Sequence, residues 1–124
     1  MSEDFVLIKF EFVLEAVQQI EEWFADIAIA QDFLNTSIGR SHYAATVLKL
    51  QTICESLKKI DAANPKVLLS HPEVEWNEIM RLRELISHHY EKLSNEVVYD
   101  SCKYDLPILK KAVEEIIEEL KQGK

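Results

Sequence analysis

The sequence predicts an all-α protein, an antiparallel bundle of four main helices with a break or kink in the last one. Its 124 residues include only two Gly and three Pro, too few turn residues for a many-stranded β protein. Apolar residues make up 48% of the chain and recur every three or four positions, the spacing of a helix face. Short connections make neighbouring helices antiparallel. We expect residues 1–124 to form one domain.

The first two helices are separated by a strong breaker. The first is predicted from about residue 5 to residue 33. Its apolar stripe comprises Phe10, Val13, Leu14, Val17, Ile20, Phe24 and Ile27. Residues 35–39, Asn-Thr-Ser-Ile-Gly, break the pattern. The second helix is predicted from Ser41, as its N-cap, to about Asp61, just before Asn64-Pro65. Cys54 falls on its apolar face, so we interpret it as a buried small hydrophobe.

The second half of the chain predicts a long connection and three further helical segments. Residues 62–73 are predicted to connect the second and third helices. Within them, Val-Leu-Leu at 67–69 is expected to form a short turn over the core. The third helix is predicted to open near Pro72 and Glu73, since Pro and acids favour a first turn. Its expected face comprises Trp76, Ile79, Met80, Arg83 and Tyr90.

After the third helix, Asn95 is predicted to cap a short helix through Tyr99. Asp105-Leu-Pro107 then predicts a restart or kink, with Asp105 as a candidate cap. The apolar positions of the final helix are Leu109, Ala112, Val113, Ile116, Ile117 and Leu120.

The net charge of −8 argues against an extended basic surface for nucleic acid, because the chain repels polyphosphate at long range. A small local RNA-binding site is compatible with this net charge. The excess of acidic residues also suits a basic partner. Cys54 and Cys102 match no metal or redox spacing, and their number favours a reducing compartment. Residues 1–14 have no basic start, and no apolar run approaches the ~18 residues that span a bilayer. We expect a cytoplasmic protein with no membrane association.

Residues 83–90, Arg-Glu-Leu-Ile-Ser-His-His-Tyr, collect an arginine, two histidines and a tyrosine near the predicted end of a helix. A histidine can take a proton from a ribose 2′-hydroxyl or give one to a leaving oxygen near neutral pH. An arginine can hold a phosphate and stabilise charge in the transition state. These groups suffice for metal-free RNA cleavage, in which the 2′-hydroxyl attacks the neighbouring phosphate.

Geometry limits this interpretation, because His88 lies ~140° around a straight helix from Arg83. The two groups can meet only if the helix ends or bends near Ser87, or if a second chain supplies one of them. On spacing alone, a capping and ion-pair cluster is the commoner role for such residues. No Asp, Glu and His cluster has metal-ligand spacing, and adjacent His88 and His89 chelate poorly, so we expect no metal and no cofactor. His42 and His71 stand alone and are interpreted as structural.

Arg83, His88 and Tyr90 reproduce the R-x4-H-x-Y signature of HepT-like toxins with a HEPN domain. The chain resembles that family over most of residues 40–120. The similar segments are 75–83, with a Trp on the approach to the arginine; 97–99; 106–109, with Leu-Pro-x-Leu; and 43–60, with Gln51 and Glu55.

The resemblance implies an all-α homodimer in which two copies of the motif face a shared cleft. It also implies a metal-independent endoribonuclease toxin, with Arg83 and His88 catalytic. The implied partner is an MntA-like minimal nucleotidyltransferase, which silences the toxin by transferring AMP to Tyr90. The implied substrate is RNA.

Three positions depart from the family pattern. Glu84 stands where relatives often have Asn, and it could orient Arg83 or His88, or repel RNA phosphate. His89 and Ser94 stand where relatives are often acidic. We expect Glu84 and His89 to support the site. Two other interpretations stay open: a non-catalytic binding subunit of a nucleotidyltransferase complex, and a structural helical dimer in which Arg83 is paired to an acid.

Overall fold

The computed structural model describes the backbone of residues 2–88 and 93–123, and the side chains of all of these except residues 2 and 3. The described residues form helices and no strand. The helices are α1 (Ser2–Phe24), α2 (Asp32–Asn35), α3 (Ser37–Ala63), α4 (Pro65–Leu69), α5 (Trp76–His88), α6 (Asn95–Asp100), a π-helical turn η2 (Ser101–Asp105) and α7 (Leu106–Gln122). The predicted all-α class is therefore confirmed.

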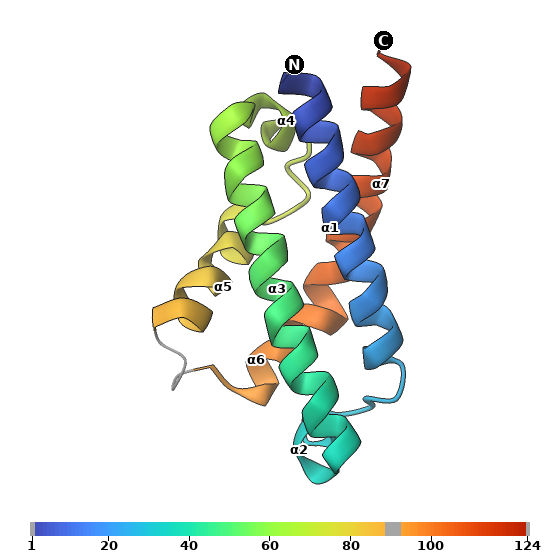
Figure 1. Ribbon diagram of the computed structural model, residues 1–124, viewed down its shortest axis with the longest axis vertical. Helices are drawn as coiled ribbons and strands as arrows, with labels where there is room; N and C mark the ends of the chain where they lie inside the picture. Colours follow the sequence, from blue (N-terminus) through green and yellow to red (C-terminus); the bar gives the residue numbers. More distant parts are fainter. Residues whose placement is uncertain (1, 89–92, 124) are drawn as a thin grey trace.

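Figure 1 shows how the long helices lie side by side, with both chain ends at the same end of the bundle. Helix α1 packs against α3 on one side and α7 on the other, and α3 also packs against α5. Successive long helices run in opposite directions, as the short connections predicted. Helix α5 thus lies at an edge of the bundle, with α3 as its main neighbour. None of the helices in the described residues is long and apolar enough to cross a membrane.

The core contains the apolar stripes predicted from the sequence. The largest fully buried side chains include Phe10 and Ile20 of α1, Leu50, Ile53, Leu57 and Ile60 of α3, and Leu109 and Ile116 of α7. Cys54 is fully buried among them, as its place on the α3 stripe indicated. Burial of these stripes against each other is the main source of helix stability, because isolated helices are marginal in water.

The first helix ends nine residues earlier than predicted, at Phe24 rather than 33. Residues 25–31 form a connection held by side chains far along the chain. The Tyr99 hydroxyl donates a hydrogen bond to the Ala28 carbonyl at 2.7 Å, and the Asn95 amide donates to the Ala30 carbonyl at 2.9 Å. The Asp32 carboxylate accepts from the Ala28 N–H. These contacts satisfy backbone groups that a continuing helix would otherwise pair.

The predicted start of the second long helix is also wrong, because Ser41 lies inside α3. The helix begins at Ser37, and the Thr36 hydroxyl caps it by accepting the Gly39 N–H at 2.8 Å. Gly39 is therefore not a breaker. It is buried in the first turn, where a β-carbon would collide with the Asp32 carbonyl oxygen. Glycine is needed there for the close approach of α2 and α3.

Helix α5 begins at Trp76, three to four residues later than predicted. Residues 71–74 instead form a turn in which the Val74 N–H donates to the His71 carbonyl at 3.2 Å. The Trp76 indole N–H donates to the same carbonyl at 3.0 Å. The short turn expected at 67–69 is part of a short helix, α4, which spans Pro65–Leu69.

The predicted break before the last helix is a π-helical turn, so α6, η2 and α7 are continuous in sequence. Ser94 caps α6 by accepting the Val97 N–H, in place of the predicted Asn95. Asp105 precedes α7 but makes no capping hydrogen bond with its side chain. A cap is not required there, because the Leu106 N–H already donates to the Ser101 carbonyl.

Candidate active site

Arg83 is positioned by the packing of α5 against α3. Helix α5 buries Ile79, Leu82 and Ile86, and the Cys54 thiol of α3 donates to the Ile79 carbonyl at 3.0 Å. This seam places Arg83 at the edge of the buried face, with 34% of its side chain exposed. The predicted apolar face was therefore slightly misplaced, since Leu82 and Ile86 share in burying α5 and Arg83 borders them.

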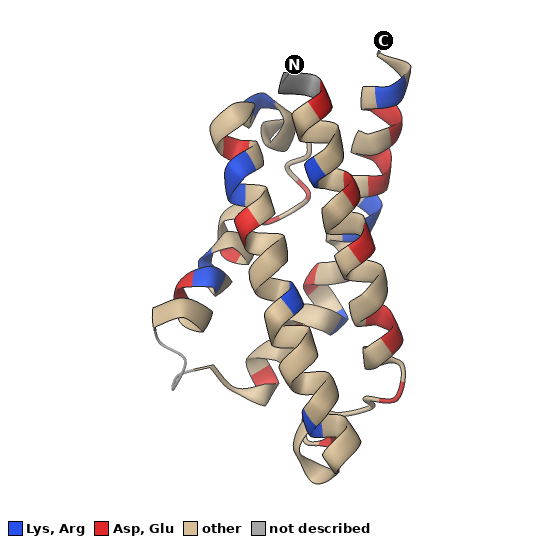
Figure 2. Ribbon diagram, viewed as in Figure 1, with Lys and Arg blue, Asp and Glu red and all other residues tan. Residues whose placement is uncertain are grey.

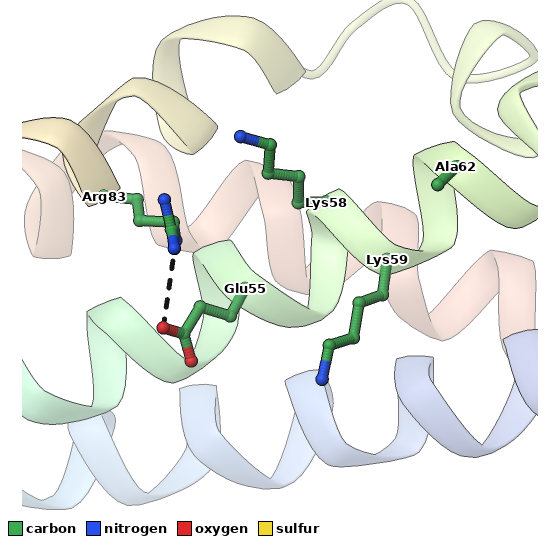
Figure 3. A pocket seen from close by; sticks show the side chains of 5 residues that line it. All are labelled: Glu55, Lys58, Lys59, Ala62 and Arg83. Atoms are coloured by element: carbon green, nitrogen blue, oxygen red, sulfur yellow. Dashed lines mark ion pairs between the residues drawn. The ribbon is translucent and has the colours of Figure 1, made fainter.

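The Arg83 side chain lies across the helix seam from Glu55. Its Nε atom is 3.8 Å from the Glu55 Oε2 atom (Figure 3). Both side chains are partly exposed, so the pair is long and solvated, and such pairs contribute at most about 1 kcal/mol. A structural role for Arg83 would instead call for a buried, saturated ion pair. Arg83 keeps the capacity to bind another anion.

Arg83 also lines an open groove of about 510 Å³ between α3 and α5, the α3–α5 groove. Its other lining residues are Glu55, Lys58, Lys59 and Ala62, all from α3 (Figure 3). Three cations and one carboxylate give the lining a net charge of +2 in a chain whose net charge is −8. The local electrostatics thus favour an anionic ligand at Arg83.

His88 lies in the last turn of α5, and its side chain is exposed. Glu84, one turn earlier on the helix, is exposed as well. Helix α5 is helical from Trp76 to His88, so Arg83 and His88 both lie on it. The helix therefore carries Arg83 and His88 ~140° apart, and one chain does not bring them together on one face. His89 and Tyr90, the other predicted site residues, lie outside the described residues.

A second cluster, which the sequence did not reveal, surrounds His71. The imidazole is buried, with its Nδ1 atom 3.1 Å from Glu73 and 3.8 Å from Glu115. Its Nε2 atom is 3.3 Å from Glu119. The burial of His71 fits the structural role that was predicted for it. The prediction that His71 stands alone was wrong. Glu115 and Glu119 lie more than 40 residues further along the chain, so no spacing rule could have joined them to His71.

The pKa of His71 is raised above its ordinary value. Burial alone would lower it, but the hydrogen bonds to Glu73 and Glu119 and their negative charges outweigh that effect. In the described part of the chain, the atoms of His71, Glu73 and Glu115 are also close enough to hold a cation, lying within 4.8 Å of one another. Both nitrogens already face carboxylates, so we interpret the cluster as a histidine whose protonated form is stabilised by three acids.

The fold and the R-x4-H-x-Y motif define an α-helical bundle of the HEPN type. The chain belongs to the HepT-like ribonuclease family: the family model described as "Ribonuclease HepT-like" matches residues 13–116. The match contains the whole α3–α5 groove and all the predicted site residues.

Archaeal relatives agree with the family match. The chain is 30% identical over 106 residues to a Thermococcus cleftensis protein named "Probable ribonuclease HepT", covering 86% of this chain and 90% of the relative. It is also 30% identical over 93 residues to "Putative RNase MJ0125" of Methanocaldococcus jannaschii, covering 74% of each chain. No solved structure matches the chain significantly.

Proposed function

We propose that this protein is a metal-independent endoribonuclease toxin in which Arg83 and His88 act on RNA. The observation that carries the proposal is the place of Arg83, the first residue of the family motif, in a basic groove of an otherwise acidic chain. Membership in the HepT-like family and the ribonuclease names of two relatives support it.

The active unit is a homodimer in this proposal. Because α5 is helical through His88, Arg83 and His88 of one chain point to different sides. A two-fold pairing of α5 helices would bring Arg83 of one chain towards His88 of the other, in two equivalent sites. The exposed His88 and the partly exposed Arg83 are both available for such a pairing.

The chemistry needs a base, an acid and a phosphate-binding cation. His88 accepts the proton of a ribose 2′-hydroxyl, whose oxygen attacks the adjacent phosphorus. The bond from phosphorus to the 5′-oxygen breaks, leaving a 2′,3′-cyclic phosphate, and the 5′-oxygen takes a proton from the second His88 or from water. Arg83 stabilises the negative charge that develops on the phosphoryl oxygens.

Regulation in this proposal depends on Tyr90. An MntA-like minimal nucleotidyltransferase would transfer AMP from ATP to the Tyr90 hydroxyl and release pyrophosphate. The new group would place a bulky phosphodiester two residues from His88 and repel an RNA phosphate electrostatically. Family resemblance carries this part, and Tyr90 itself lies outside the described residues.

Cleavage of a labelled RNA in the presence of EDTA tests the nuclease. We expect the wild-type chain to yield cyclic-phosphate ends, and His88→Ala and Arg83→Ala to lose at least about 100-fold in rate, as for removal of a general base or an electrostatic stabiliser. His42→Ala is the matched control and should keep full activity. Cleavage that survives His88→Ala would remove the catalytic assignment.

A second candidate is a non-catalytic subunit that binds the nucleotidyltransferase. The exposed Glu84, on the helix face next to His88, favours it, because an acid there opposes the approach of RNA phosphate. Tight binding of the partner together with no RNA cleavage by the purified chain, and none after Glu84→Asn, would select this candidate.

A further inference from the structure

We propose that Lys58 and Lys59 of α3 bind the RNA backbone beside Arg83, so that the α3–α5 groove is the substrate-binding track of the enzyme. This inference rests on the ribonuclease function proposed above. It assigns the residues that hold RNA next to the reacting groups, and these residues lie outside the family motif.

The first observation is that these two lysines have no ion-pair partner among the residues that the structure describes. Among the described residues, Lys110 pairs with Glu21, and Lys121 with Glu11. Lys9 and Lys103 lie over aromatic rings. Lys58 and Lys59 are exposed. They have no ion pair in the same part of the chain, as is also true of Lys49, Lys66 and Lys111, but only Lys58 and Lys59 line the groove beside Arg83. Their charge is therefore available to an external anion.

The second observation is their register on the helix. Lys58 and Lys59 follow Glu55 by three and four residues, and Ala62 follows Lys58 by four, so these residues lie on one stripe of α3. The small Ala62 side chain adds little bulk at this end of the stripe, and Arg83 faces the other end from α5 (Figure 3). Figure 2 shows this basic segment of α3 with an acidic residue at either end, above the basic residues of α5 in the view.

The two lysines have different positions relative to Arg83. Lys58 leans towards the side of the groove where Arg83 lies, whereas Lys59 points away from it (Figure 3). Consecutive helix residues diverge by ~100°, so the two ammonium groups do not converge on one phosphate. We assign Lys58 to the phosphate next to the one that Arg83 binds, and Lys59 to a phosphate further along the strand.

The lining also indicates which part of RNA is recognised. Glu55, Lys58, Lys59, Ala62 and Arg83 include no aromatic ring on which a base could stack. Contacts from ammonium and guanidinium groups to phosphates carry affinity and little sequence information. The groove therefore binds the backbone of single-stranded RNA without reading its bases.

The test measures RNA binding without cleavage, in the His88→Ala background. Fluorescence anisotropy with a labelled 12-nucleotide single-stranded RNA gives Kd at several salt concentrations. We expect Lys58→Gln and Lys59→Gln each to weaken binding roughly three- to tenfold at low salt, and each to lower the slope of log Kd against log salt by about 0.7. Lys111→Gln, an exposed α7 lysine outside the groove, should change neither quantity.

Two results would overturn the proposal. One is a parent chain that binds RNA while the double variant Lys58→Gln/Lys59→Gln keeps the same Kd and salt slope. The other is a loss of affinity that differs strongly between oligo-U and oligo-A, since a backbone contact acts equally on both. Circular dichroism checks that the variants are folded. Cleavage by the chain with His88 intact is measured separately, so a failure of the track is distinguished from a failure of the nuclease assignment.

Discussion

The guanidinium Nε of Arg83 lies 3.8 Å from a carboxylate oxygen of Glu55, across the seam between α5 and α3. Both partners are partly exposed, so the pair is weak and open to exchange. In the proposed ribonuclease function, Glu55 orients the guanidinium over the groove in the free protein, and an RNA phosphate replaces the carboxylate on binding. On this account Glu55 is a positioning residue.

We predict that Glu55→Gln separates binding from turnover. Without the competing carboxylate, Arg83 binds phosphate more readily, so KM should fall about threefold. The less ordered guanidinium stabilises the transition state less well, so kcat should fall by a similar factor. Steady-state cleavage of a fluorogenic RNA measures both constants. Glu78→Gln, which removes the acid paired with Arg81 on the same helix, is the control and should leave both constants unchanged. An increase in KM for Glu55→Gln would contradict the positioning role.

A second prediction concerns Gly39. A β-carbon at this position meets the Asp32 carbonyl oxygen, which belongs to backbone and cannot rotate away. Gly39→Ala should therefore lower the free energy of unfolding by about 1–3 kcal/mol, the usual cost of overpacking. Urea denaturation followed by circular dichroism measures it.

Gly123→Ala provides the control for this measurement. Its β-carbon would lie 3.1 Å from the Glu119 carbonyl oxygen, a milder contact than the one at Gly39, just after the last turn of α7. A change below about 0.5 kcal/mol is expected there. Equal changes in the free energy of unfolding for the two variants would show that α2 and α3 are not tightly packed at Gly39.

A third prediction concerns the two cysteines, which the structure shows as free and buried. Burial raises the pKa of Cys54 to about 12 and that of Cys102 to about 12. The thiolate is the reactive form, so native protein at pH 8 should react with a disulfide reagent only as it unfolds. The kinetics of thionitrobenzoate release measure this, with urea-unfolded protein as the positive control. A fast stoichiometric reaction of the native chain would show that one thiol is accessible.

The parts of the fold that were predicted from the sequence depend on local pattern. The apolar stripes of α1, α3 and α7 follow from spacing along one segment. The largest error lies where distant residues intervene. Tyr99 and Asn95 bind the carbonyls of Ala28 and Ala30 and so stabilise a connection in place of the end of a helix.

The candidate site shows the same division. Arg83 and His88 were predicted from one short motif, and both lie on α5, where a separation of five residues corresponds to ~140° on a straight helix. The α3–α5 groove was not foreseen, because Lys58 and Lys59 belong to another helix and carry no motif. The partners of His71 were missed for a similar reason, since α7 supplies Glu115 and Glu119 only after folding.

The last prediction concerns how His71 couples stability to pH. The charged groups that face its imidazole are Glu73 from its own turn, and Glu115 and Glu119 from α7, with Lys111 near Glu73. Its pKa is raised in the folded protein, so the folded state binds the proton more tightly than the unfolded state. This contribution is fully present below the unfolded pKa of about 6.5 and is lost as pH rises through the folded value.

We therefore expect the urea concentration at the unfolding midpoint of the wild-type chain to decrease as the pH is raised from about 6 to about 8, the range in which histidine ordinarily titrates. His71→Gln keeps hydrogen-bonding capacity but cannot be charged, so its midpoint should be lower below pH 6.5 and nearly flat across the range. His42→Gln, at a partly exposed α3 histidine, should retain the wild-type slope. A His71→Gln variant with the wild-type slope would show that another group titrates, because the imidazolium is the charge that the three acids around it stabilise.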